Sequence, residues 1–436
     1  MKKILSVLGF ALLLICMPAL GHAQYLRNSY FMEGSSARME LNPALAPGRG
    51  YINLPAVGAF GLEVSSNSLG AQDVFEIMSD GGTFYANDKF MKLLKDENML
   101  GLKLNTNLIS FGWHKPEGFW SFSVAAMANV DAIIPKAMFQ YAYDLENELS
   151  TGLKDYMVRN ERLNLNTYTE LSLGYAKQVG ERLSIGGKAK VLLGYANIDL
   201  NVKKLDIKTY KLDNAADNIY PYCNIDTDVE MALSGKGIEL EHDSYGYIDD
   251  VMLGKFGIGG YGAAVDLGLE FKVTERLSLC ASVVDLGFIS WGKSSSEVYK
   301  SRNTVQTYEK PDADILDFET FALKDGVKKA RKTQLAPTVT AGGELGFFND
   351  KLGLGILSVT SFGEYKKYSE LMAVATFRPT TLFNVSASYS VLEGTDTFGL
   401  ALKLGPVMVG TDYMFLSENA KQVNGYLGLS IPLARK

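Results

Sequence analysis

Few residues of this chain have the types and spacing that catalysis requires. Histidine is the side chain that most often acts as a base near neutral pH, and the chain has only three. His22 lies in an N-terminal leader, His114 in a predicted turn beside Trp113, and His242 in the predicted loop EHDSYG. A hydrolase would need a nucleophile, a base and an orienting group close together. We therefore predict that the protein is not an enzyme and has no catalytic residues.

Patterns that would bind a metal or a cofactor are equally weak. The acidic residues between 239 and 250 supply the carboxylates that Ca²⁺ prefers, but without a fixed ligand spacing, which favours a solvated loop. The three cysteines form no CxxC pair, so a zinc site is not indicated. The glycines of GIGGYG at 257–262 are typical of the start of a strand. We predict neither a metal nor a cofactor.

Charged residues recur on the polar side of segments in which apolar and polar residues alternate. From Phe383 to Val391, for example, apolar residues occupy one face and Asn384 and three serines the other. Both charge signs occur, which favours a lumen crosslinked by ion pairs, or plugged by the N-terminal segment, over an open ion-selective pore. A merely hydrated interior is the alternative. The charged residues predicted to face a lumen are Glu170, Lys188, Lys190, Asp266, Glu270, Lys272, Glu344, Arg378, Lys403 and Asp412.

The same period of two predicts an all-β fold with about 14 long strands. We place them at 51–66, 101–113, 119–133, 162–179, 183–203, 257–273, 276–291, 334–348, 351–363, 369–378, 381–393, 396–405, 407–417 and 422–433. A soluble sandwich also alternates, so periodicity alone leaves two architectures open. Strands of ten or more residues are long enough to cross a membrane at a tilt, whereas strands of globular proteins average about five or six.

Connection lengths favour a single antiparallel transmembrane β-barrel. Short turns alternate with long loops at about 67–100, 134–161, 204–256 and 292–333. Tight periplasmic turns and large surface loops are typical of outer-membrane barrels, and an even strand count returns both termini to the periplasm. Apolar stretches at 74–78, 90–94 and 315–330 predict short helices over the outer mouth.

Two positions interrupt the alternation. Leu108-Ile109 and Val283-Val284-Asp285 place residues of one kind side by side. A β-bulge would restore the phase and turn Asp285 inward with Gly287, leaving Leu286 and Phe288 facing lipid. Misplaced strand ends are the alternative.

Composition and the N-terminus indicate an exported, folded protein. Residues 1–23 read as a cleaved signal peptide, with Lys2 and Lys3 ahead of an apolar run and small residues before Gln24. Hydrophobic residues make up 47% of the 436 and charged residues 21%, which argues against disorder. A net charge of −6 gives no support to nucleic-acid binding. The remaining chain divides into an N-terminal segment, 24–50, and the barrel, 51–436.

The segment 24–50 carries SSARMELNPALAPG and precedes a barrel of about 14 strands, a combination that resembles the FadL-like family of outer-membrane transporters for fatty acids and other hydrophobic compounds. The resemblance implies that 24–50 folds as a hatch, or plug, inside the lumen, with Asn42, Pro43 and Ala44 as its motif. DLGFISW at 285–291, APTVTAGGELGFFNDKLGLG at 336–355 and FRPTTLFNVSASYS at 377–390 resemble uncharacterised FadL-like barrels of Bacteroidetes. No ligand-contacting residues carry over.

Two functions remain open from the sequence. The first is passive uptake of a hydrophobic, fatty-acid-like small molecule across the outer membrane of a Gram-negative cell. The second is a barrel that transports nothing and serves as a docking or accessory subunit of a secretion or surface complex. The expected partners are outer-membrane lipid, a hydrophobic ligand or bound lipid or detergent, and a protein at the extracellular loops.

Overall fold

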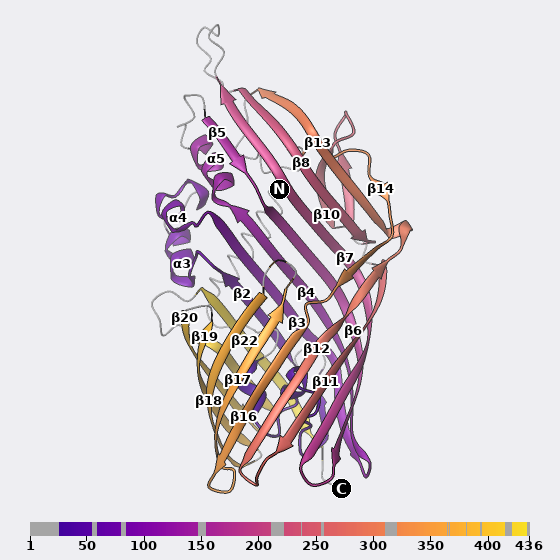
Figure 1. The fold of residues 1–436 in the computed structure, drawn as a ribbon, viewed down its shortest axis with the longest axis vertical. Helices are drawn as coiled ribbons and strands as arrows, with labels where there is room; N and C mark the ends of the chain where they lie inside the picture. The colour runs from indigo at the N-terminus through magenta and orange to yellow at the C-terminus, as the bar shows by residue number, and fades with distance from the viewer. Residues whose placement is uncertain are drawn as a thin grey trace.

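The computed structural model describes residues 26–54, 59–79, 84–146, 154–210, 222–236, 238–253, 257–309, 321–363, 365, 367–380, 382–392, 395–414 and 421–433. The predicted signal peptide lies outside these ranges. Antiparallel strands form a closed barrel of 14 strands (Figure 1), which confirms the predicted fold class.

The strands of the ring follow the chain order. They are β1 (Tyr51–Asn53) with β2 (Phe60–Ser66), β3 (Glu97–Lys115), β4 (Gly118–Pro135), β6 (Glu161–Val179), β7 (Leu183–Tyr210), β11 (Gly260–Lys272), β12 (Leu277–Trp291), β15 (Arg331–Gln334) with β16 (Thr338–Phe347), β17 (Leu352–Phe362), β18 (Lys367–Thr380), β19 (Phe383–Leu392), β20 (Thr395–Leu404), β21 (Val407–Met414) and β22 (Gln422–Pro432). The first and last strands close the ring, since both β1 and β2 pair with β22 on one side and with β3 on the other.

The remaining elements lie in the N-terminal segment and in the long connections. They are η1 (Arg27–Phe31), α2 (Arg38–Leu41), α3 (Ala71–Ser79), η2 (Phe84–Ala86), α4 (Asp88–Leu93), α5 (Lys136–Glu146), β5 (Lys154–Val158), β8 (Tyr222–Gly235), β9 (Ile238–His242), β10 (Ile248–Leu253), η3 (Lys293–Ser295), β13 (Ser296–Glu309) and β14 (Val327–Lys328). None of the helices in the described part of the chain is long and apolar enough to cross a membrane.

The two faces of the ring are chemically opposite. On β11 the side chain of Asp266 is fully buried, whereas its neighbours Val265 and Leu267 are 42% and 55% exposed. Apolar residues also face outward on β12 and on β16 to β21. Polar residues lie inside on most of these strands, but Leu357 and Val359 of β17 and Met372 and Val374 of β18 form an inner apolar cluster with Phe31. Such an apolar belt is stable only against lipid, as in outer-membrane barrels.

Both predicted bulges are present. The register of β3 against β4 shifts between Asn107 and Ile109, and that of β11 against β12 shifts next to Asp266. Asp285 has a positive φ of 61° and is buried, while Leu286 and Phe288 lie on the exposed face. The bulge, rather than a misplaced strand end, therefore restores the alternation.

The predicted long loops are not simple loops. Strand β7 ends at Tyr210 rather than at 203, and its two halves have different neighbours: residues 183–194 pair with β11, whereas 196–210 pair with β8. β8 then pairs with β13, and β5 adds to the far end of β7. These strands rise beyond the ring as an extension sheet (Figure 1), so much of 204–256 and 292–333 is β structure, whereas 134–161 contains α5 and β5.

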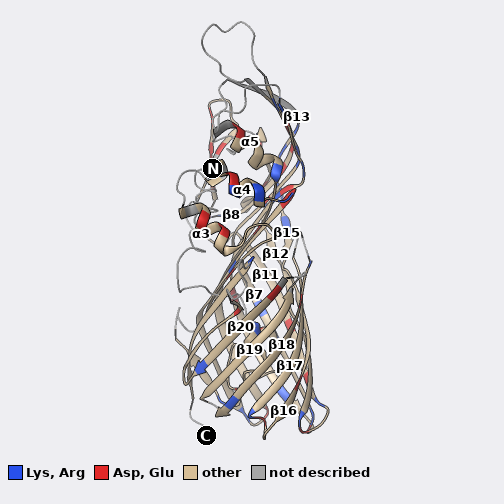
Figure 2. Ribbon diagram, turned by 90° about the vertical axis from the view of Figure 1, so that its left-hand side faces the viewer, with Lys and Arg blue, Asp and Glu red and all other residues tan. Residues whose placement is uncertain are grey.

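The extension sheet has its own apolar core. Ile207 on β7, Ile225 on β8 and Tyr299 on β13 are buried together with Tyr141 of α5 and Ile248 of the β9–β10 hairpin. The helices α3, α4 and α5 lie at this long-loop end of the barrel (Figure 2). Predicted helices at 74–78 and 90–94 are therefore confirmed. The helix predicted at 315–330 is wrong for residues 321–330, which hold turns and β14, and its first part lies outside the described residues.

Candidate functional site

The N-terminal residues 26–50 contact inward-facing side chains of strands from several sides of the ring. Asn28, Ser29, Tyr30 and Asn42 are fully buried. Such polar residues are stable in a buried position only when their hydrogen bonds are made. The hydrogen-bond partners of the segment therefore show how the barrel holds it.

One anchor lies at the start of the segment, on β21. The Asp412 carboxylate accepts the backbone N–H groups of Arg27, at 2.9 Å, and Asn28, at 2.8 Å. The Arg27 guanidinium lies 3.2 Å from the Glu370 carboxylate of β18 and donates to the Tyr413 hydroxyl. Asn424 of β22 donates to Asp412 at 3.0 Å, so three strands hold this one point.

A second anchor is the guanidinium of Arg378 on β18. It forms a bidentate pair with Glu344 of β16, at 2.7 and 3.1 Å, and donates to the Phe31 carbonyl at 2.8 Å. The planar fork of arginine allows it to bind the carboxylate and the backbone carbonyl at once. Arg378 and Glu344 thus connect the segment to β16 and β18.

The motif residues lie against β11 and β12. The Asn42 side-chain amide donates to the Tyr30 hydroxyl at 2.9 Å and to the Leu269 carbonyl at 3.2 Å. Its oxygen accepts the backbone N–H of Ala44 at 3.0 Å, and this bond fixes the turn that contains Pro43. Ser282 of β12 donates to the Leu41 carbonyl at 2.6 Å.

Inward-facing glycines make room for the segment. A side-chain carbon at Gly186 would collide with the Pro43 carbonyl group, and one at Gly268 with the side chains of Asn42 and Pro43. Further round the ring, Gly355 is covered by Phe31, Gly399 by Asn28 and Gly410 by Leu26. Glycine in a strand is intrinsically unfavourable, and a close backbone or side-chain approach is the usual reason for it.

Two lysines of β7 lie next to this motif, on the long-loop side of Gly186. Lys188 pairs with Glu40 of the segment, at 3.3 Å. Lys190 is surrounded by three carboxylates, Asp285 at 2.6 Å, Asp266 at 2.9 Å and Glu170 at 3.2 Å, so one ammonium connects β7 with β6, β11 and β12.

Of the ten charged residues predicted to face a lumen, eight are therefore buried on the inner face. Lys403 is the eighth, and its ammonium donates to the Gly405 carbonyl at 3.1 Å. Glu270 is half-buried and Lys272 exposed at the short-turn end of β11. His114 and His242 are exposed and far from each other along the chain; the ring of His114 is 2.9 Å from the Pro47 carbonyl. Within the described ranges, no group of His, Cys, Asp or Glu is arranged to hold a metal ion.

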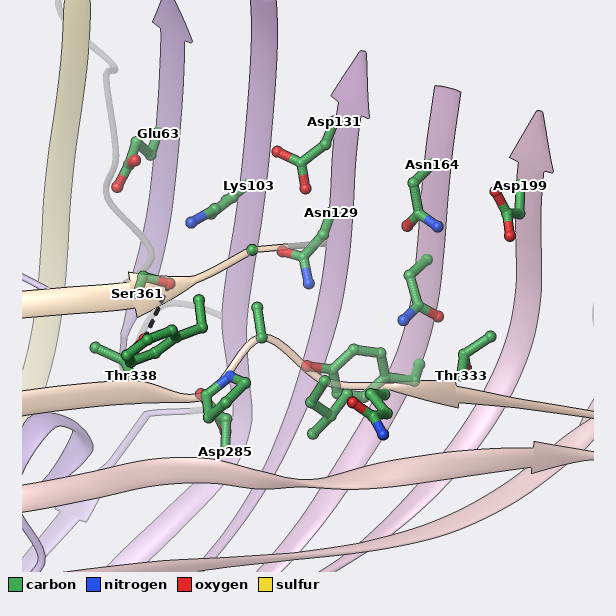
Figure 3. A pocket seen from close by; sticks show the side chains of 18 of the residues that line it. Glu63, Lys103, Asn129, Asp131, Asn164, Asp199, Asp285, Thr333, Thr338 and Ser361 are labelled. Atoms are coloured by element: carbon green, nitrogen blue, oxygen red, sulfur yellow. Dashed lines mark hydrogen bonds between the residues drawn. The ribbon is translucent and has the colours of Figure 1, made fainter. Parts of the chain in front are cut away.

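A cavity of about 550 Å³ lies toward the long-loop end of the ring. Neighbouring strands give it one polar wall, formed by Glu63, Lys103, Asn129, Asp131, Asn164, Asn166 and Asp199 (Figure 3). We call the lining formed by Leu335, Ala336, Pro337, Val359 and Phe362 the apolar wall. Arg27 and Leu41 of the N-terminal segment also line the cavity, together with Tyr168 and Asp285. Polar residues that alternate with the apolar wall line it as well: Arg331, Lys332, Thr333, Gln334, Thr338 and Ser361.

Part of this cavity lining could be predicted from the sequence. The alternation in 162–179 already separated Asn164 and Asn166 from the leucines, and the bulge placed Asp285 inside. Glu63, Lys103 and Asp199 were missed because only cross-strand register, such as Glu63 opposite Lys103, brings them to one level of the ring. Arg331, which donates to Asp199 at 2.9 Å, was not predicted because it lies in the range assigned to the loop 292–333.

The closed ring, its apolar belt and its polar interior define an outer-membrane β-barrel. Residues 43–412 match a family of unknown function, DUF5723, and the chain belongs to this family. No curated protein sequence matches the chain.

Several solved structures are similar to it. The P. putida toluene transporter TodX is 11% identical, with a TM-score of 0.41 over 96% of this chain and 100% of that chain. A deltaS2S3 mutant of the TodX monoaromatic hydrocarbon channel is 9% identical, with a TM-score of 0.42 over 92% and 95%. A Pseudomonas aeruginosa FadL homologue is 10% identical, with a TM-score of 0.30 over 95% and 98%.

Proposed function

We propose that this barrel mediates passive uptake of a small hydrophobic molecule that carries a polar end, and that residues 26–50 are its gate. The observation that carries the proposal is that Arg27 and Leu41 belong both to the buried segment and to the lining of the cavity. Displacement of the segment would therefore extend the cavity toward the short-turn end. The two unlike walls favour a solute with both an apolar and a polar part.

The proposal includes an orientation. The long-loop end would face the outside and the short turns the periplasm, where both termini would lie. Passage would need no catalytic step, since burial of the apolar part drives capture and a concentration gradient drives release. The FadL-like resemblance supports a hydrophobic compound; placement within a Bacteroidetes branch stays a prediction.

A reversible crosslink between segment and wall tests the gate. Glu40→Cys with Lys188→Cys replaces an existing contact of 3.3 Å, so a short thiol-reactive crosslinker should connect the two positions. We expect the crosslinked barrel to stop uptake of the hydrophobic fluorophore N-phenylnaphthylamine into cells, and cleavage of the crosslink to restore it. Each single variant, treated identically, is the control. Undiminished uptake by the crosslinked protein would rule out this gate.

The extension sheet favours a second function, that of a docking subunit. An ordinary surface loop has no apolar core of its own, whereas this sheet has one and forms a folded unit beyond the ring. Such a unit offers a stable surface for a partner protein. On that account, the crosslink would leave function intact, whereas removal of the β9–β10 hairpin would abolish assembly with a partner protein.

A further inference from the structure

We propose that the cavity binds a neutral, hydroxyl-bearing head group, with the apolar body of the same molecule against the apolar wall. This rests on the proposed function and names its substrate class. A fatty-acid carboxylate would then be a poor ligand, although the cavity lining contains basic residues.

The first observation is a pair of buried acceptors that have no donor. The side-chain oxygens of Asn129 and Asn166 make no hydrogen bond with any described residue, and Asn166 is only 8% exposed. The two residues are directly opposite each other in the β4–β6 ladder and both line the cavity. A buried acceptor left unpaired costs about 1–3 kcal/mol, so a donor from a ligand would relieve two such penalties at one place.

The neighbouring groups extend this acceptor surface. Asp131 follows Asn129 on the same face of β4 and directs its carboxylate into the same space (Figure 3). A carboxylate ligand cannot donate, and here it would meet amide oxygens and a like charge. A carboxylate ligand would therefore gain little from the unpaired oxygens of Asn129 and Asn166.

Charge balance argues against an ion of either sign. The cavity lining contains four basic residues, Arg27, Lys103, Arg331 and Lys332, and four acidic ones, Glu63, Asp131, Asp199 and Asp285. A hydroxyl both donates and accepts, so it can bond to Asn166 or Asp131 and also receive from Lys103. An organic cation would satisfy the acceptors but would bring its charge near the Lys103 ammonium, which lies between Glu63 and Asp131 (Figure 3).

The facing wall explains the apolar part of the ligand. Leu335 and Pro337 come from the break between β15 and β16, and Val359 and Phe362 from β17. Their position across the cavity from the amides allows one molecule to satisfy both walls at once, as ligand pockets commonly do.

Three probes with one alkyl chain and different heads test the proposal: octyl glucoside, octanoate and octylammonium, each below its micelle-forming concentration. Binding to the full-length barrel in lipid nanodiscs is measured by calorimetry, with empty nanodiscs as the blank. We expect saturable binding of octyl glucoside, at least about tenfold tighter than that of either ion, as loss of one or two hydrogen bonds implies.

Two matched variants locate the site. Asn166→Leu should weaken glucoside binding about tenfold, because it removes one acceptor at the cavity wall. Asn384→Leu is the control: Asn384 is also fully buried with an unpartnered amide, but it is not part of the cavity lining. The control should bind octyl glucoside as the unaltered protein does.

Three results would overturn the inference. They are equal or tighter binding of octanoate or octylammonium, equal effects of the two variants, or no saturable binding of octyl glucoside, which would mean that water alone occupies the acceptors. Failure here is separable from failure of the uptake proposal. If the crosslink still blocks passage, only the head-group class is wrong; if octyl glucoside binds but the crosslink has no effect on passage, the gate is wrong.

Discussion

At the residue scale, the two faces of a strand should respond differently to the same charge. Leu267 is exposed on the apolar belt near the middle of β11, and Leu267→Arg should destabilise the inserted barrel by about 2–4 kcal/mol. Ser361 lines the cavity, where an arginine has room and water, so Ser361→Arg should have a smaller effect. Urea unfolding of each variant from lipid vesicles measures the difference. Equal losses would mean that the phase of one of these strands is reversed.

Adjacent glycines provide a second comparison at this scale. Gly186→Ala forces a methyl group into the Pro43 backbone. This clash should weaken the packing of the segment against the wall by about 1–3 kcal/mol. A more weakly held segment should increase the ion conductance of the barrel. At Gly187 the nearest atom to a new methyl would be 3.4 Å away, so Gly187→Ala should be silent. Planar-bilayer recordings of both variants test the pair. Identical current traces from the two variants would mean that the packing of Pro43 against β7 does not require glycine at position 186.

For individual residues, the sequence predicts the face of the strand but not the contacts. Glu170, Lys190 and Asp266 could be assigned to one face because alternation fixes side-chain direction within a strand. Their convergence on one ammonium could not be predicted, since it depends on the register between β6, β7 and β11. Register is set by turns and bulges that act over the whole ring.

At the element scale, the packing of α5 against β5 should depend on pH. The Asp144 carboxylate accepts from Lys154 at 2.7 Å, from Tyr156 at 2.6 Å and from Gln140 at 2.9 Å. Burial acts to raise the pKa of Asp144, but these donors outweigh it and the pKa is lowered. The stabilisation is therefore present above the unfolded pKa of about 4 and is lost as the pH falls through the lower folded value.

Hydrogen exchange of the α5 amides measures this dependence. We expect faster opening below about pH 4, and Asp144→Asn should open faster at neutral pH and lose the acid dependence. Asp155, on the neighbouring strand and more than half exposed, is the control position, and Asp155→Asn should change little. Acid-dependent opening that survives in Asp144→Asn would assign the effect to another group.

Most strands of the ring were predictable because they are long and alternate over most of their length. The extension sheet was not, because its strands lie in stretches that also contain turns, and because β7 changes partner at residue 195 without a break in its own chain. Nothing in a single strand shows that its neighbour changes. The apolar residues of β7 after position 195 have the pattern of an ordinary strand end.

At the scale of the whole molecule, the proposed mechanism gives the barrel wall and the N-terminal segment separate roles. Strand pairing and the apolar belt use residues outside the segment. The segment is held by inward-facing groups such as Asp412, Arg378 and Ser282 and by backbone contacts such as that between Leu433 and Gly50. Removal of the segment should therefore leave an inserted barrel and change only what passes through it.

Conductance of a variant lacking residues 26–50 tests this central claim most directly. Heat-modifiable migration on gels first shows that the variant has folded. The intact protein should then give small or no current steps in a planar bilayer, and the folded variant large, frequent ones. A folded variant with the same conductance as the intact protein would contradict the account, because the segment would then not close the lumen.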